Sequence, residues 1–100
     1  GVNIYPAEIE RAIETHPGVA AAAVIGVPDP KWGEVGKAVV ELKPNASLTL
    51  RELLDHLGVR LGKFKLPKYL AVVDELPRTP ASGKVQKFVL KEKYGKADND

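Results

Sequence analysis

Prolines and glycines interrupt this chain so often that no long helix or strand fits between them. Its 100 residues include eight prolines and nine glycines. The clearest breaks are His16-Pro17-Gly18, Pro28-Asp29-Pro30 and Pro44-Asn45, because proline ends helices and glycine and asparagine favour turns. Only short elements form between such breaks, and they must bury their apolar sides against one another in one small core.

The segments between the breaks alternate between helical and strand patterns. A helix is predicted from Pro6 to His16, since proline suits the first helical position and apolar residues follow at helical spacing. The apolar segments Val19–Val27 and Gly36–Lys43 are predicted to be strands. Both segments end at turn signals, Pro28-Asp29-Pro30 after the first and Pro44-Asn45 after the second.

The second half of the chain contains the clearest helix signal. Thr49 and Glu52 have the spacing of a capping box, and Gly62 is expected just beyond the helix end. One apolar stripe follows the cap: Leu50, Leu53, Leu54, Leu57 and Leu61. A strand is predicted at Tyr69–Val73, and a last helix from about Val85 to Tyr94.

The predicted order αββαβα indicates an α+β domain, in which helices pack against a small, mostly three-stranded sheet. Residues 1–94 are expected to form this domain, and residues 95–100 a polar acidic tail. An active site that excludes water must be enclosed on several sides, and a 100-residue domain is small for that. Its length therefore argues against a complete catalyst.

Composition excludes several classes of site. The chain has no cysteine, so disulfides, thiolate metal sites and cysteine nucleophiles are excluded. The two histidines, His16 and His56, show no ligand spacing, and no serine lies in a nucleophile motif. No apolar run approaches 18 residues and no signal peptide is visible, so we expect no membrane span and a cytoplasmic location.

The net charge of +2 conceals an uneven distribution. Residues 1–59 carry five basic against eight acidic side chains, which gives −3. Residues 60–96 carry ten against three, which gives +7, and the last four residues add −2. A basic third indicates a phosphate-bearing ligand, a nucleic acid or an acidic protein surface, whereas the alternative is a solvated surface rich in lysine.

A polar loop presents Lys84 directly after a glycine. The loop runs from Pro77 to Gly83, and the flexible backbone before Lys84 would let its ammonium group reach phosphate or carboxylate oxygens. It is not a P-loop, because Arg78 stands where that motif needs glycine and Val85 where it needs serine or threonine. The alternative is an ordinary turn lysine.

Two further segments combine aromatic and basic residues. Trp32 lies in a predicted loop between strands, where it is either a core residue or an exposed indole that stacks on a base or fills a partner's pocket. Residues 63–68 (KFKLPK) place Phe64 among three lysines and could bind phosphate and stack on a base. Alternatively this segment is an extended connector with Phe64 and Leu66 turned inward.

Four segments carry motifs that are specific when taken together: residues 1–10 (GVNIYPAEIE), 27–34 (VPDPKWGE), 64–68 (FKLPK) and 76–87 (LPRTPASGKVQK). In this order they resemble the adenylate-forming enzymes, the group of acyl-CoA synthetases, luciferases and peptide-synthetase adenylation domains. The last segment has one extra residue in its loop. The resemblance covers residues 1 to about 94, and it is to the small C-terminal domain of those enzymes only.

The resemblance implies a two-step ligase. The full enzyme activates a carboxylic acid with ATP and Mg²⁺ to an acyl-adenylate, and the acyl-CoA branch then transfers the acyl group to coenzyme A. The large N-terminal domain binds ATP and the acid, and the C-terminal domain pivots to present a different face for each step. The small domain alone is expected to be inactive.

The resemblance also assigns roles to individual residues. Lys84 matches the lysine that enters the active site for adenylation. Gly1 matches a glycine that lines the tunnel of the pantetheine arm. Trp32 and Phe64 match aromatic positions beside the CoA nucleotide, and Lys68 matches a basic contact near its phosphates.

One position departs from the family pattern, since Leu66 stands where some relatives carry arginine. Lys63 and Lys65 are nearby substitutes for that charge. Two alternatives remain: a non-CoA adenylating enzyme such as a peptide-synthetase adenylation domain, and a basic module that binds nucleic acid. The resemblance favours neither nucleic acid nor a membrane as partner, and it leaves the carboxylic acid undefined.

Overall fold

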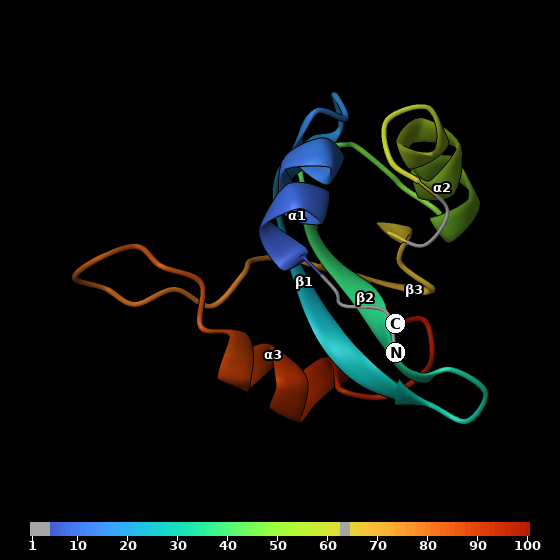
Figure 1. The fold of residues 1–100 in the computed structure, drawn as a ribbon. Coiled ribbons are helices and arrows are strands. Elements are labelled where there is room, and N and C mark those ends of the chain that lie inside the picture. The colour runs from blue at the N-terminus through green and yellow to red at the C-terminus, as the bar shows by residue number, and fades with distance from the viewer. Residues whose placement is uncertain (1–4, 63–64) are drawn as a thin grey trace.

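A computed structural model describes residues 5–62 and 65–100 of the chain. Its helices and strands follow the order α1 (Pro6–Glu14), β1 (Val19–Asp29), β2 (Gly33–Leu42), α2 (Leu50–Gly58), β3 (Tyr69–Val73) and α3 (Lys87–Tyr94). The predicted α+β class and the order αββαβα are confirmed (Figure 1).

The three strands form one mixed sheet in the order β1-β2-β3. β1 and β2 are an antiparallel hairpin, whereas β3 runs parallel to β2. A parallel neighbour requires a crossover connection, and α2 lies within that connection. β1 and β3 are therefore the two edges of the sheet, and β2 is its buried centre.

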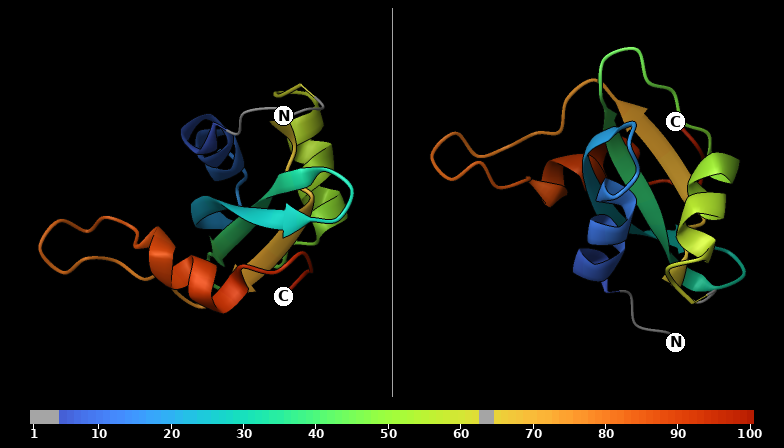
Figure 2. Two further views of the ribbon diagram at one scale, coloured as in Figure 1. Left: turned by 60° about the horizontal axis from the view of Figure 1, so that its bottom comes forward. Right: turned by 90° about the horizontal axis from the view of Figure 1, so that it is seen from above.

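Helices cover both faces of the sheet, as Figure 2 shows: α1 and α2 lie on one side and α3 on the other. Alternate strand residues point to opposite faces, which divides the apolar core into two clusters. The first cluster joins α1 and α2 to the sheet through Ile9, Ile13, Val24, Val40, Leu53 and Leu57. The second joins α3 through Ile25, Val27, Val39, Ala71, Leu76 and Leu90.

Two glutamates fasten α1 to the outer edge of β1. The Glu10 carboxylate accepts from Val24 N at 2.8 Å, and the Glu14 carboxylate accepts from Ala22 N at 3.3 Å. These amides belong to an edge strand and would otherwise lack partners. The Glu10 side chain is only 19% exposed, so it contributes to the packing of α1 on the sheet and not to the solvated surface.

Several element ends differ from the predicted ones. β1 continues to Asp29 although Pro28 lies within it, because an edge strand tolerates proline. α2 begins at the predicted capping box but ends at Gly58, so the prediction of Gly62 as its terminating residue is wrong. α3 begins at Lys87, because Val85 instead pairs with Arg78 across the preceding loop.

No helix in residues 5–62 and 65–100 is both long and apolar enough to cross a membrane.

Candidate functional site

The loop before α3 is a short hairpin that projects from the domain (Figures 1 and 2). Arg78 and Val85 form an isolated antiparallel bridge, and Thr79 N donates to Lys84 O at 2.8 Å. The loop closes where Gly83 N donates to Thr79 O at 2.7 Å. Gly83 has a φ of +70°, a conformation that glycine adopts without strain and other residues rarely do.

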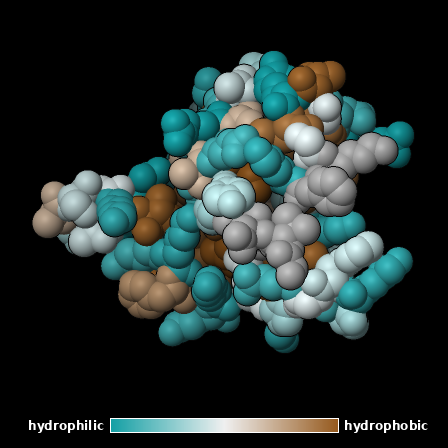
Figure 3. All heavy atoms as spheres, in the orientation of Figure 1, coloured by the Kyte–Doolittle hydropathy of each residue, from teal (hydrophilic) through white to brown (hydrophobic). Residues whose placement is uncertain are grey.

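This hairpin presents Lys84 to solvent. Its side chain is exposed, and no described carboxylate lies within ion-pair distance of its ammonium group. The Arg78 guanidinium instead donates to Gly83 O at 2.9 Å and stiffens the loop next to Lys84. The space-filling view shows the loop reaching beyond the main body (Figure 3). The Lys84 ammonium group is thus an exposed positive charge on a projecting hairpin, suited to bind phosphate or carboxylate oxygens of a partner.

Trp32 lies at the turn between β1 and β2 and is 58% exposed. The alternative that it is a core residue is therefore wrong. Asp29 Oδ1 accepts from the backbone N–H groups of Lys31 and Trp32, both at 2.9 Å. Gly33 completes the turn with a φ of +84°. The turn thus holds the indole outward by backbone hydrogen bonds rather than by packing.

Two lysines flank the indole. Lys31 Nζ lies 5.0 Å from the ring centroid and Lys68 Nζ lies 5.2 Å from it, both within cation–π range. Lys68 N donates to Gly36 O at 2.9 Å, which fixes the chain after residues 63–64 beside β2. An exposed indole with two ammonium groups near its ring can stack on a base while the lysines contact phosphates. The structure therefore brings together the predicted residues Trp32 and Lys68 and adds Lys31.

Asp29 also connects this turn to β3. Tyr69 Oη donates to Asp29 Oδ2 at 3.0 Å. The hydrogen bonds from the Trp32 and Lys31 amides are the main reason why the pKa of Asp29 lies below its ordinary value. The same carboxylate, as a hydrogen-bond acceptor, raises the pKa of Tyr69. The roles of Asp29 and Tyr69 were not predicted from the sequence. Asp29 could have been, because aspartate in a turn often bonds to the backbone that follows it, whereas no local signal indicates Tyr69.

Two of the predicted site residues, Gly1 and Phe64, lie outside the described residues. Lys65 pairs with Glu8 at 3.0 Å, and Leu66 packs half-buried against the core cluster of α1 and α2. Figures 1 and 2 show the Lys84 hairpin and the Trp32 turn at opposite ends of the domain. They therefore form two separate candidate sites.

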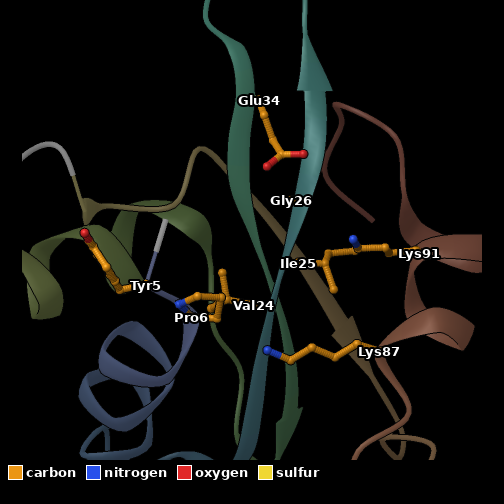
Figure 4. A pocket seen from close by; sticks show the side chains of 8 residues that line it. All are labelled: Tyr5, Pro6, Val24, Ile25, Gly26, Glu34, Lys87 and Lys91. Atoms are coloured by element: carbon orange, nitrogen blue, oxygen red, sulfur yellow. The ribbon is translucent and has the colours of Figure 1, made fainter. Parts of the chain in front are cut away.

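A cavity of about 470 Å³ opens at the outer edge of β1, between α1 and α3 (Figure 4). Glu34 reaches across Gly26, where an added Cβ would lie only 2.7 Å from the Glu34 Cδ. Lys87 and Lys91 line the side of α3, and Lys87 pairs with Glu10 at 2.7 Å. None of these residues was predicted to be part of a site.

The two histidines meet although they are far apart in sequence. Their ring centroids are 5.0 Å apart, and His56 Nε2 bonds to Thr15 Oγ1 at 2.7 Å, which joins α2 to α1. Burial, and then the charge of Arg60, lower the pKa of His56. Within the described residues no group of three or more histidine, aspartate or glutamate side chains could hold a metal ion.

Comparison with known families identifies the domain. A family described as the AMP-binding enzyme C-terminal domain matches residues 8–84. The chain belongs to this family. The match includes the Trp32 turn and ends at Lys84, so both candidate sites lie within the AMP-binding enzyme C-terminal domain.

Individual relatives agree with this assignment. The chain is 50% identical over 95 residues to a feruloyl-CoA synthase from Amycolatopsis sp. and 44% identical over 94 residues to the fatty acid–[acyl-carrier-protein] ligase ScoC from Streptomyces coeruleorubidus. The matches cover 95% and 94% of this chain, but only 19% and 18% of those proteins. The crystal structure of ATP-bound MatB from Rhodopseudomonas palustris superposes with a TM-score of 0.88 at 46% identity, over 95% of this chain and 19% of that one.

Proposed function

We propose that this chain is the mobile C-terminal domain of an AMP-forming acid–CoA ligase, and that it serves both half-reactions of the enzyme. The observation that carries the proposal is the presence of two exposed, oppositely placed sites on one member of this family. The hairpin of Lys84 serves acyl-adenylate formation, and the face of Trp32 and Lys68 serves thioester formation.

In the first half-reaction, Lys84 stabilises negative charge. The carboxylate of the acid attacks the α-phosphate of ATP, and pyrophosphate leaves. An ammonium group beside the carboxylate and phosphate oxygens lowers the energy of the transition state most, because negative charge moves between these oxygens there. The exposed position of Lys84 and its lack of a described ion-pair partner support this role, since the charge is available to enter a neighbouring active site.

In the second half-reaction, the opposite end of the domain receives coenzyme A. Trp32 stacks on the adenine, and Lys68 contacts the phosphates, with Lys31 beside them. Gly1 leaves room for the pantetheine arm, and Phe64 provides a second aromatic contact. These two roles derive from the motif resemblance, since both residues lie outside the described part of the chain.

The principal partner of the domain is a large N-terminal AMP-binding domain in the same protein. The small share of the relatives' length that this chain covers supports it. The exposed side chain of Phe88, 63% accessible on α3 next to the Lys84 hairpin, offers an apolar contact for such a partner. The described residues form no acidic cluster for Mg²⁺, so we assign no step on this domain to the ion.

The deciding experiment uses Lys84→Ala in the whole protein that carries this domain. Adenylate formation, measured as acid-dependent ATP–pyrophosphate exchange, should fall about 10²- to 10³-fold, as it does when one electrostatic contact to a transition state is removed. Thioester formation from a supplied acyl-adenylate should be retained. Lys91→Ala, an exposed lysine on α3, is the matched control and should change neither rate.

A second variant tests the other face. Gly1→Leu should block thioester formation and spare pyrophosphate exchange, because a side chain there would obstruct the thiol. Equal loss of both half-reactions in Lys84→Ala would contradict the assignment of two separate faces.

A carrier protein is the second candidate acceptor, because ScoC, a ligase that acts on an acyl-carrier protein, is 44% identical to this chain. The Trp32 face favours free coenzyme A, whose adenine the indole can stack on. Comparing coenzyme A with a phosphopantetheinylated carrier protein as the acceptor distinguishes the two enzymes. Faster transfer to the carrier protein would favour the second.

A further inference from the structure

A lysine in the centre of the sheet is completely buried. Lys37 lies in β2, and its side chain has 0% exposure. A buried ammonium group costs several kcal/mol unless it is paired and hydrogen-bonded. Neither candidate site uses Lys37, and nothing in its sequence context suggests why a core strand carries it.

Within the described part of the chain, the hydrogen-bond partners of the Lys37 ammonium group come from residues 96–100. Lys37 Nζ donates to Lys96 O at 3.2 Å, to Asp98 Oδ1 at 3.3 Å and to Asp100 Oδ2 at 2.5 Å. The two carboxylates are themselves 56% and 40% exposed. The acidic tail thus closes the Lys37 site from the solvent side.

The same residues cover the outer edge of β3. Leu70 N donates to Asn99 Oδ1 at 2.8 Å, Asp100 N donates to Leu70 O at 3.0 Å and Val72 N donates to Asp100 O at 3.0 Å. The last two bonds pair Asp100 with β3 in the manner of a parallel strand. Figure 2 shows the tail running from α3 to this edge.

We propose that the outer edge of β3 and the ammonium group of Lys37 form a binding site for an extended acidic peptide, and that residues 98–100 occupy it in cis. The site combines the two features of strand addition, which are main-chain hydrogen bonds to a sheet edge and a pocket for alternate side chains. Side chains two residues apart point to the same side of an extended chain, so an Asp-x-Asp pattern brings both carboxylates to one ammonium group.

The tail is attached to the domain by a short tether. α3 ends at Tyr94, so only a few residues separate the helix from Asp98. A short tether raises the effective concentration of the tail at the site to the millimolar range, and the same peptide in solution should bind weakly but specifically. The tail also lies outside residues 8–84, which match the family. Lys37 and the outer edge of β3 belong to neither candidate site, so the proposal does not rest on the proposed ligase function.

The first test uses the double variant Asp98→Asn, Asp100→Asn in the 100-residue chain. Hydrogen exchange measured by NMR should accelerate roughly tenfold or more at the Leu70 and Val72 amides, because the tail loses its anchor on Lys37. Amides within the β1–β2 ladder should be unaffected, and Asp55→Asn on the surface of α2 is the matched control. Unchanged exchange at Leu70 and Val72, or equal acceleration throughout the sheet, would overturn the proposal.

The second test supplies the ligand in trans. The double variant, whose own tail is weakened, is titrated with a free peptide of residues 95–100 (GKADND) up to about 10 mM, above the usual effective concentration of a tether. Saturable shifts should appear at Leu70 and Val72, and a peptide with asparagine in place of both aspartates should produce none. Either no saturable shift with the acidic peptide or equal binding of both peptides would rule the site out.

Discussion

A single carboxylate, that of Asp29, holds the Trp32 turn in place. Asp29 bonds to two backbone amides of the Trp32 turn and to the hydroxyl of Tyr69, so one side chain both shapes the turn and fixes it to the sheet. The indole is 58% exposed, so packing alone does little to define its position. The orientation of Trp32 therefore depends on charge-assisted hydrogen bonds.

This dependence predicts how Asp29→Asn behaves with pH. The folded pKa of Asp29 lies below the ordinary value of 3.8, so its charged form stabilises the fold above that pH. That contribution is lost as the pH falls from 3.8 through the lowered pKa. Asp29→Asn has no carboxyl group at this position, so its stability lacks this dependence on pH. The free energy of unfolding of the wild-type chain should exceed that of the variant at neutral pH, and the difference should shrink on acidification.

Urea unfolding from neutral pH to about pH 3 measures this difference. Tyr69→Phe is the matched variant, because it removes one donor to Asp29 and leaves the carboxylate and both amides in place. It should show a smaller loss of stability at neutral pH. A difference between wild type and Asp29→Asn that stays constant with pH would contradict the role given to the charge.

Among the elements, local signals determined what could be predicted. The bounds of β3 were predicted correctly, and the capping box of Thr49 and Glu52 begins α2 as expected. Element ends were harder, because they depend on neighbours. Leu61 continues the apolar stripe and packs against the core, yet it follows the end of α2 instead of lying within it.

The capping box supports a stability prediction for α2. Thr49 Oγ1 accepts from Glu52 N at 3.1 Å, and the Glu52 carboxylate accepts from Thr49 N at 3.0 Å. Thr49→Ala should lower the free energy of unfolding by about 1 kcal/mol, within the usual range of roughly 0.5–2 kcal/mol for a lost cap. Thr49→Ser keeps the accepting oxygen, so urea unfolding should find it close to wild type. Equal losses in the two variants would mean that the methyl group, and not the cap, stabilises the helix.

Across the whole molecule, contacts between distant segments escaped prediction. The sequence motifs indicated Lys84, Trp32 and Lys68 as candidate site residues, because each lies in a local pattern of turn, glycine or aromatic residues. The partners of Lys37 lie 59 to 63 positions away, and no local pattern connects them. The tail was likewise interpreted as a polar extension, although its backbone pairs with β3. Long-range pairing of this kind depends on the topology of the sheet, which composition and periodicity do not determine.

The arrangement of core and sites predicts that the chain folds alone and catalyses nothing alone. Helices cover both faces of the sheet, and each face has its own apolar cluster, so the described core is complete without a partner. By contrast, the side chains of Lys84 and Trp32 are exposed, and the described part of the chain does not enclose either of them. The proposed transfer of acyl and phosphoryl groups needs a site from which water is excluded, and the proposed N-terminal domain would have to complete it.

Calorimetry and an exchange assay test the two halves of this prediction separately. The 100-residue chain should unfold in one cooperative transition, with an enthalpy of about 60–80 kcal/mol, as is usual for a domain of this length. It should show no acid-dependent ATP–pyrophosphate exchange, whereas the whole protein should. A broad transition without cooperativity would mean that the domain depends on its partner for folding. Exchange activity in the isolated chain would show instead that one side of the proposed active site is sufficient for adenylation.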